Sequence, residues 1–180
     1  KHLILLAETM EGYRNLVKIV SKASTEGFNY KPRADHDLLC QYSKGIIALS
    51  AGIQGEVPQY ILQDNMEGAR RAVEWYIETF GKDNFFLEIQ NHGLPEELRA
   101  QQVLCQLADE YDLGIVASND FHYVMKDDAD AQDIRVCIQT GRRRAEVDRL
   151  KFPNDEFYLK SGDEMAELFG HIPGALANTV

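Results

Sequence analysis

The chain has 180 residues, of which 44% are hydrophobic and 27% are charged, and its formal net charge is −10 at pH 7. These values fit a globular domain with a sizeable core, and the acidic balance argues against a surface devoted to nucleic acid or another polyanion. No apolar run is long enough to span a bilayer, and the cysteines lie too far apart for a disulfide framework. We therefore expect a protein of the reducing cytoplasm.

The first half of the chain predicts strands that alternate with helices. In chain order, the expected elements are a strand at 2–7, helices at 12–24 and 35–42, a strand at 45–50, and helices at 55–63 and 66–80. Asp35 is a suitable N-cap for the second helix, and Pro58 is tolerable only in the first turn of the third. Apolar residues three and four apart make 66–80 a clear amphipathic helix.

The second half repeats this order and then departs from it. The expected elements are a strand at 84–89, a helix at 95–111, a strand at 114–118, a helix at 128–140, an irregular charged link at 141–152, and two short helices near 163–169 and 173–179. Pro95, followed by Glu96 and Glu97, marks a helix start, because the helix dipole favours acidic residues there. Short apolar strands alternating with helices predict an α/β fold whose parallel sheet is covered on both faces.

The stretch "SNDFHY" at 118–123 directly follows a predicted strand, at the edge where parallel sheets gather their chemistry. In an extended segment, the side chains of Asp120 and His122 project to the same side and can converge on one cation. Zinc, manganese and iron accept this mix of oxygen and nitrogen ligands. The alternative is that Asp120 caps the next turn while His122 packs against a neighbour.

Other polar residues carry a weaker signal. His92 follows the strand at 84–89, where a turn residue before Gly93 is the simpler interpretation. Glu88 lies inside an apolar run and needs a partner if it is buried, such as a metal, an arginine or backbone donors. His36 and His171 lie in polar segments and are expected at the surface.

Basic residues cluster at one place, in the "RRR" of 142–144 with Arg149 and Lys151 beyond it. Such runs are usually solvated loops, and contact with a nucleic-acid backbone is the alternative. Lys31 and Arg33 in "NYKPR" are further candidates for a contact with substrate or with the DNA phosphates.

Several segments together resemble a known family. They are "HLILLA", "GYRNLVKIVSKASTEGF", "YKPR", "GIIALSA", "NFFLEIQNHG", "ASNDFHYV", "CIQTG" and "FYLKSGDEMAELF" with "IPGALANTV". In this order they resemble the alpha subunit of bacterial DNA polymerase III of the DnaE type, over nearly the whole chain. The resemblance implies the later part of a PHP (polymerase and histidinol phosphatase) domain at 1–125 and a mostly helical connection toward the polymerase palm at 126–180.

The family resemblance also implies a fold and a metal site. PHP domains are distorted (β/α)7 barrels with parallel strands, and their metal ions (zinc, manganese or iron) are held by ligands from many strand ends. His2, Asp120 and His122 match ligand positions of the family motif, although His2 stands at the front of its strand. The earlier ligands, and strands that would cover an apolar sheet edge, are expected upstream of Lys1 in a longer chain.

One position departs from the family pattern. Where the family often has the cysteine of "LSACLAGE", this chain has Gly52 in "LSAGIQGE". Glycine has no side chain to bind metal, so the resemblance leaves open whether another group takes that place or whether the metal cluster is incomplete.

The resemblance implies a function in chromosome replication. The family joins nucleotides with magnesium ions held by palm aspartates, which are absent here, so this chain alone is expected to be inactive as a polymerase. For the PHP region, a metal-dependent 3′–5′ exonuclease or phosphoesterase is one hypothesis. A non-catalytic scaffold that docks the proofreading exonuclease and a free-standing phosphatase are the alternatives. The expected partners are DNA, that exonuclease and the sliding clamp, with no membrane contact.

Overall fold

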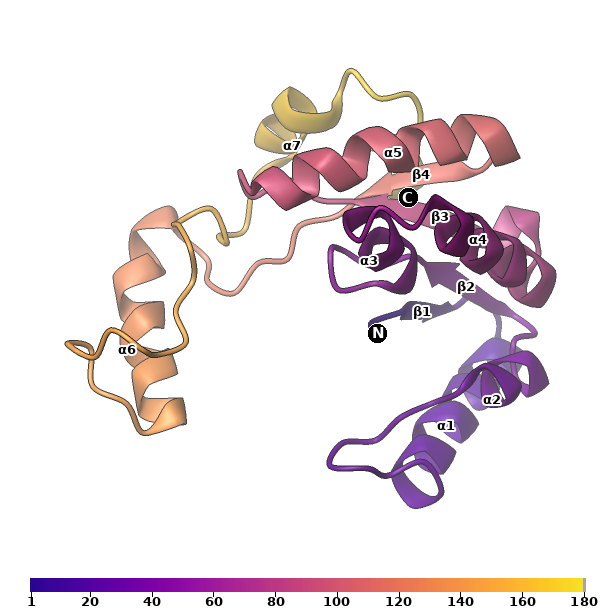
Figure 1. Cartoon of the computed structure of the whole chain (residues 1–180), viewed down its shortest axis with the longest axis horizontal. Coiled ribbons are helices and arrows are strands. Elements are labelled where there is room, and N and C mark those ends of the chain that lie inside the picture. Colours follow the sequence, from indigo (N-terminus) through magenta and orange to yellow (C-terminus); the bar gives the residue numbers. More distant parts are fainter. Residues whose placement is uncertain (180) are drawn as a thin grey trace.

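The computed structural model describes residues 1–179 as an open four-stranded sheet with helices around it (Figure 1). Strands β1 (Ile4–Ala7), β2 (Ile46–Leu49), β3 (Phe85–Ile89) and β4 (Gly114–Ala117) lie side by side in this order. Neighbouring strands among β2, β3 and β4 pair in parallel, which confirms the predicted α/β class. The open sheet is consistent with part of a PHP barrel.

Strand β1 corrects the expectation that every strand is parallel. It pairs antiparallel with β2, so that Ala7 lies opposite Ile46. The backbone N–H of Glu8, directly after β1, donates to the carbonyl of Gly45, directly before β2, over 3.0 Å. The end of β1 therefore lies beside the start of β2, and the helices between them form an excursion rather than a crossover, which makes the pairing antiparallel.

The helices agree with the predicted positions through most of the chain. They are α1 (Met10–Thr25), α2 (His36–Gln41), α3 (Glu56–Leu62), α4 (Met66–Phe80), α5 (Pro95–Tyr111), α6 (Ala129–Thr140) and α7 (Gly162–Phe169), with 3-10 turns η1 (Lys82–Asn84), η2 (Lys126–Asp128) and η3 (Ala177–Thr179). The carboxylate of Asp35 accepts the N–H of Leu38 over 2.9 Å, which confirms the predicted cap. Across residues 1–179, none of these helices has both the length and the apolar character of a membrane span.

The second short helix predicted near 173–179 is absent except for the single turn η3. Gly174 adopts a positive φ of 76°, directly after Pro173, and that left-handed conformation does not continue a helix. The segment at 170–176 consists of turns instead.

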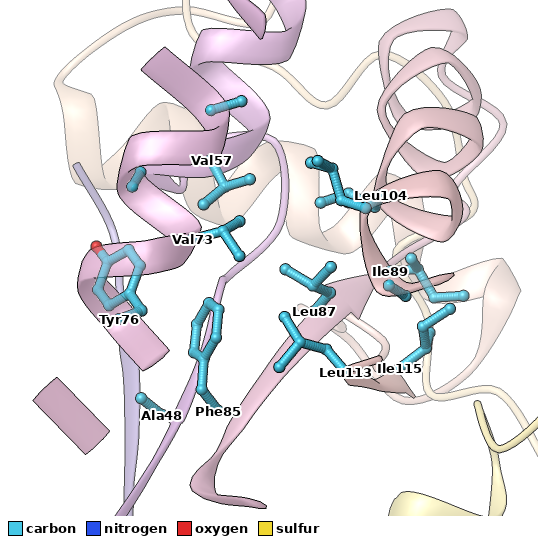
Figure 2. Packing of buried hydrophobic residues seen from close by; sticks show 14 of the residues in the cluster. Ala48, Val57, Val73, Tyr76, Phe85, Leu87, Ile89, Leu104, Leu113 and Ile115 are labelled. Atoms are coloured by element: carbon cyan, nitrogen blue, oxygen red, sulfur yellow. The ribbon is translucent and has the colours of Figure 1, made fainter. Parts of the chain in front are cut away.

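The core lies between β2–β4 and the helices α3, α4 and α5. Figure 2 shows Val57 of α3, Val73 of α4 and Leu104 of α5 directed toward Leu87 of β3. Strand β1 is the edge of the sheet, and its Ile4 and Leu6 side chains keep 36% and 49% of their surface exposed. The expected apolar edge is therefore present.

The C-terminal segment returns to the sheet after α6, which stands away from it in Figure 1. The N–H of Ala117 at the end of β4 donates to the carbonyl of Ala175 over 2.8 Å, and Phe169 and Ala175 are buried in the same core. The division at 125/126 stays a prediction, and apolar residues between Met165 and Leu176 contribute to the core of the sheet.

The start of α7 is held by one carboxylate. Oε2 of Glu164 accepts hydrogen bonds of 2.8 Å from both the N–H and the hydroxyl of Ser161, and Oε1 accepts one from the Tyr158 hydroxyl. These bonds, with that of Tyr158 the strongest, lower the pKa of Glu164 to about 2.

We expect Glu164→Gln to lower the melting temperature at neutral pH, because the amide cannot accept all of these bonds. The folded pKa lies below the usual value of 4.5, so the carboxylate stabilises the protein above that pH and loses this effect as the pH falls through about 2. The difference in melting temperature between the variant and the parent should shrink accordingly in acid. Glu167→Gln, at an exposed position of the same helix, is the control. A difference that persists at pH ~2 would contradict this assignment.

Candidate functional site

A cavity of about 510 Å³ opens at the carboxyl ends of β2, β3 and β4. One wall comes from the loops that follow these strands and carries Gly52, Gln90, Asp120 and His122. Residues of α6 and of the segment at 150–157 complete the lining. A volume of this size is in the range of small-molecule sites, which span roughly 300–1,000 Å³.

Asp120 and His122 lie together on the cavity wall, as their spacing predicted. Nε2 of His122 is 3.4 Å from Oδ1 of Asp120. The backbone N–H of His122 donates to the carbonyl of Phe157 over 2.8 Å, and its ring lies against Phe152 at 4.6 Å between centroids. Both polar side chains remain exposed toward the cavity, so they are accessible to a ligand.

His2 reaches the same cavity from the edge of the sheet. Its backbone N–H donates to the carbonyl of Gln54 over 3.0 Å, in a bridge to the loop after β2. The structure thus places His2, Asp120 and His122 around one space. Within residues 1–179, however, no three histidine, cysteine, aspartate or glutamate side chains converge closely enough to hold a metal ion.

Glu88 lies behind this wall and is 1% exposed. Its Oε1 accepts hydrogen bonds from the Ser118 hydroxyl and, over 3.3 Å, from Nε2 of Gln90, whereas Oε2 has no partner among the described residues. Burial raises the pKa of Glu88. The partners of this buried carboxylate are therefore a hydroxyl and an amide, and not a metal or an arginine, among the described residues.

His92 lies in the turn before Gly93, as the sequence indicated, and its side chain is also buried and hydrogen-bonded. Its Nδ1 lies 2.7 Å from Oε1 of Glu97, and its backbone N–H donates to Oε2 of the same carboxylate over 2.6 Å. Its Nε2 lies 3.1 Å from Oδ1 of Asn119, and its ring stacks on Phe157 at 4.4 Å. The side-chain amide of Asn119 also donates to the carbonyl of Tyr158 over 2.9 Å. This network ties the loops after β3 and β4 to the C-terminal segment.

The sequence did not join two cations of the cavity lining into one site. Arg135 of α6 and Lys151 both line the cavity, and neither forms an ion pair with a carboxylate in the part of the chain that is described. They stand sixteen positions apart in the chain and share no motif, so no local pattern could have joined them.

Apart from Lys151, the basic residues that the sequence singled out lie outside the cavity lining. Arg149 pairs with Asp133 over 2.5 Å, and Arg144 pairs with Asp130 over 2.6 Å, so the charged link is tied to α6 by ion pairs. Lys31 and Arg33 are exposed and are not part of the cavity lining. Their contact with DNA phosphates stays a prediction.

Comparison with known proteins assigns the chain to a family. A family model described as "PHP domain" matches residues 1–92. The chain belongs to the PHP domain family. It is 46% identical over 179 residues to "DNA polymerase III subunit alpha" of Treponema pallidum (strain Nichols), a match that covers 99% of this chain and 15% of that protein.

"DNA polymerase III subunit alpha" of Deinococcus radiodurans is 49% identical to the chain over 164 residues. This match covers 91% of the chain and 12% of the Deinococcus protein. The Thermus aquaticus protein is 47% identical over 164 residues, 91% of this chain and 13% of that one. The PHP chain described here thus spans less than a sixth of the length of these relatives, and the resemblance noted in the sequence is confirmed.

The donors in this PHP domain suit a divalent metal ion in kind but are incomplete as a set. Two imidazoles and a carboxylate are ligands that manganese, iron and zinc accept. They are exposed to one cavity, yet His2 does not join the Asp120–His122 pair in a single cluster. Gly52 adds no donor, and the space beside it is occupied by the amide group of Gln90, which a Cβ at position 52 would overlap.

We expect Glu97→Ala to destabilise the fold by about 3–5 kcal/mol, because it removes the partner of a buried histidine. Glu97 is 4% exposed, whereas its neighbour Glu96 is exposed, so Glu96→Ala is the matched control. Urea unfolding at pH ~7 measures the difference. Equal unfolding midpoints for the two variants would rule out this role for the His92–Glu97 pair.

Proposed function

We propose that this chain is the PHP portion of the alpha subunit of a replicative DNA polymerase. Three observations support this proposal: the relatives carry that name, they match up to 99% of the chain, and their similarity continues beyond residue 125. A free-standing phosphatase would not need the connection at 126–180. The palm aspartates and their magnesium ions then belong to other parts of the polypeptide.

The 180-residue chain alone should not extend a primer, whereas the full-length subunit should. A primer-extension assay with both proteins at equal concentration, each with and without magnesium, tests this expectation. Incorporation of nucleotides by the isolated chain would contradict the assignment of polymerase chemistry to other residues.

For the PHP cavity, we propose metal-dependent hydrolysis of a phosphate ester at the 3′ end of DNA. The supporting observation is that Asp120 and His122 line the same cavity as the cations Arg135 and Lys151. Metal ligands and basic side chains in one cavity are suited to a phosphodiester, because its non-bridging oxygens carry negative charge.

In this proposal His2, Asp120 and His122 hold the metal ion and are neither general acid nor general base. A bound metal supplies Lewis-acid polarisation of the phosphate and activation of a water. Arg135 and Lys151 bind the non-bridging oxygens. The water oxygen bonds to phosphorus, the bond between phosphorus and the 3′ oxygen breaks, and that oxygen takes a proton. The products are a shortened strand and a nucleoside monophosphate.

A non-catalytic scaffold is the second candidate, and the incomplete donor set favours it. Under this alternative the PHP domain stabilises the polymerase and docks the proofreading exonuclease. The burial of Phe169 and Ala175 in the core supports a structural role, since the segment after α6 depends on the sheet.

In the full-length subunit, we expect Asp120→Ala to lower bound metal and Arg135→Ala to leave it unchanged. With a primer that ends in a mismatch, Asp120→Ala should lower the rate of 3′ nucleotide removal. Arg135→Ala, and separately Lys151→Ala, should instead raise KM, because each removes a contact to the phosphate. Elemental analysis gives the metal content, and product analysis on gels gives the rates.

Asp127 is exposed and follows the stretch with Asp120 and His122 in the chain. Asp127→Ala is therefore the control for removing a carboxylate. Unchanged metal content in Asp120→Ala would refute the ligand role. Normal metal content together with no nucleotide removal by the parent protein would favour the scaffold.

A further inference from the structure

A second and much smaller cavity, of about 10 Å³, lies between α5 and the carboxyl end of β3. Glu88 of β3 and Gln101 of α5 both line it, and it shares Gly52, Ile53 and Gln90 with the lining of the large cavity. By the same measure, a single buried water needs roughly 10–15 Å³. The small cavity therefore has room for one water molecule and for no larger ligand.

Two buried oxygen atoms of this lining lack a hydrogen-bond partner. They are Oε2 of Glu88 and Oε1 of Gln101, and in the part of the chain that is described, residues 1–179, no other buried side-chain nitrogen or oxygen is left without one. Burial without a partner is unfavourable, because the atom gives up its hydrogen bonds to solvent. Since both atoms belong to side chains of one cavity of water size, a partner shared by the two accounts for both.

The remaining lining selects a water over a cation. Both oxygens of Glu97 are already engaged by His92, and the amide nitrogen of Gln90 is engaged by Ser118 and Glu88. The other lining residues are apolar or glycine. Two free oxygens are too few for a cation, which requires about four to eight ligands, whereas a buried water is satisfied by about two to four hydrogen bonds.

A water suits both protonation states of Glu88, whose pKa is raised by burial. If the side chain is ionised, the water donates one hydrogen to Oε2 and the other to Oε1 of Gln101. If Oε2 carries a proton, that hydroxyl donates to the water, which still donates to Gln101. A direct bond between the two side chains would require the protonated acid, and no such bond is formed.

We infer that one structural water binds between Oε2 of Glu88 and Oε1 of Gln101 and joins α5 to β3. Through Glu88 this link continues to Ser118 and Gln90, at the ends of β4 and β3. The water thus gives the buried carboxyl group a further partner and ties the helix to the edge of the sheet that carries the large cavity. The inference depends neither on the proposed metal site nor on the polymerase assignment.

A crystal structure of the full-length polypeptide, at a resolution that shows ordered waters, tests the site without any substitution. We expect density for one water within hydrogen-bond distance of both oxygens. A continuous cavity without density between Glu88 and Gln101 would overturn the inference, and so would density whose short contacts identify a cation.

Gln101→Met tests the energetic role of the water, because the two side chains have similar lengths but methionine offers no strong acceptor. With the water bound, the variant removes one of its partners, so amide hydrogen exchange in α5 and β3 should become about threefold to tenfold faster. In a dry cavity, the variant would remove an unpartnered oxygen, and exchange would become slower. Mass spectrometry of the full-length polypeptide measures these rates locally. Slower or unchanged exchange contradicts the inference.

Gln102→Met is the matched control, because Gln102 is the next residue of α5 and is exposed. It should leave the exchange rates unchanged, and an equal acceleration in this control would show that the effect does not come from the cavity. Glu88→Gln is the second variant. Its amide keeps an oxygen for Ser118 and presents an N–H to the water, so the water should remain in the crystal structure of this variant. Loss of the water there would also overturn the inference.

Discussion

The buried hydrogen bonds among His92, Glu97 and Asn119 hold the functional edge of this sheet together. The carboxylate of Glu97, in the first turn of α5, accepts a hydrogen bond from the backbone N–H of His92 and lies within hydrogen-bond distance of its ring Nδ1. Asn119 carries the connection on to the carbonyl of Tyr158. The neighbouring carbonyl of Phe157 receives the N–H of His122. The position of His122 therefore depends on a segment that His92, Glu97 and Asn119 hold in place.

Local rules account for the parts of the structure that the sequence predicted well. Periodicity placed α4 and α5 at their observed bounds, because each helix buries one apolar face and begins at a clear signal. The same rules placed Asp120 and His122 on one side of an extended segment, where they lie 3.4 Å apart. The antiparallel direction of β1 was not predicted. It is set by the hydrogen bond between Glu8 and Gly45, which lie 37 positions apart, and a contact over that separation produces no periodic pattern in the sequence.

The candidate site could be predicted only in part, for a related reason. In the sequence, Gly52 stands where the family pattern often has a cysteine ligand, and glycine has no side chain that could bind a metal. In the structure the space beside it is filled by Gln90, whose amide nitrogen bonds to Glu88 of β3 and to Ser118 after β4. A residue that fills such a space from a neighbouring strand has no fixed spacing in the sequence from the position beside it. Arg135 became part of the cavity for the same reason, through the packing of α6 and not through a motif.

The distribution of charge adds a last argument about ligand class. The chain carries a net charge of −10, so an unpaired cation facing a cavity is more informative here than in a basic protein. Arg144 and Arg149 form ion pairs with aspartates of α6. These ion pairs hold the charged link at 141–152 against that helix. Arg135 and Lys151, from the same region, form no ion pair within residues 1–179 and line the cavity together with Asp120 and His122. An anionic ligand with a metal ion would suit this proposed site, because the cations would meet phosphate oxygens while the carboxylate and imidazoles would meet the metal.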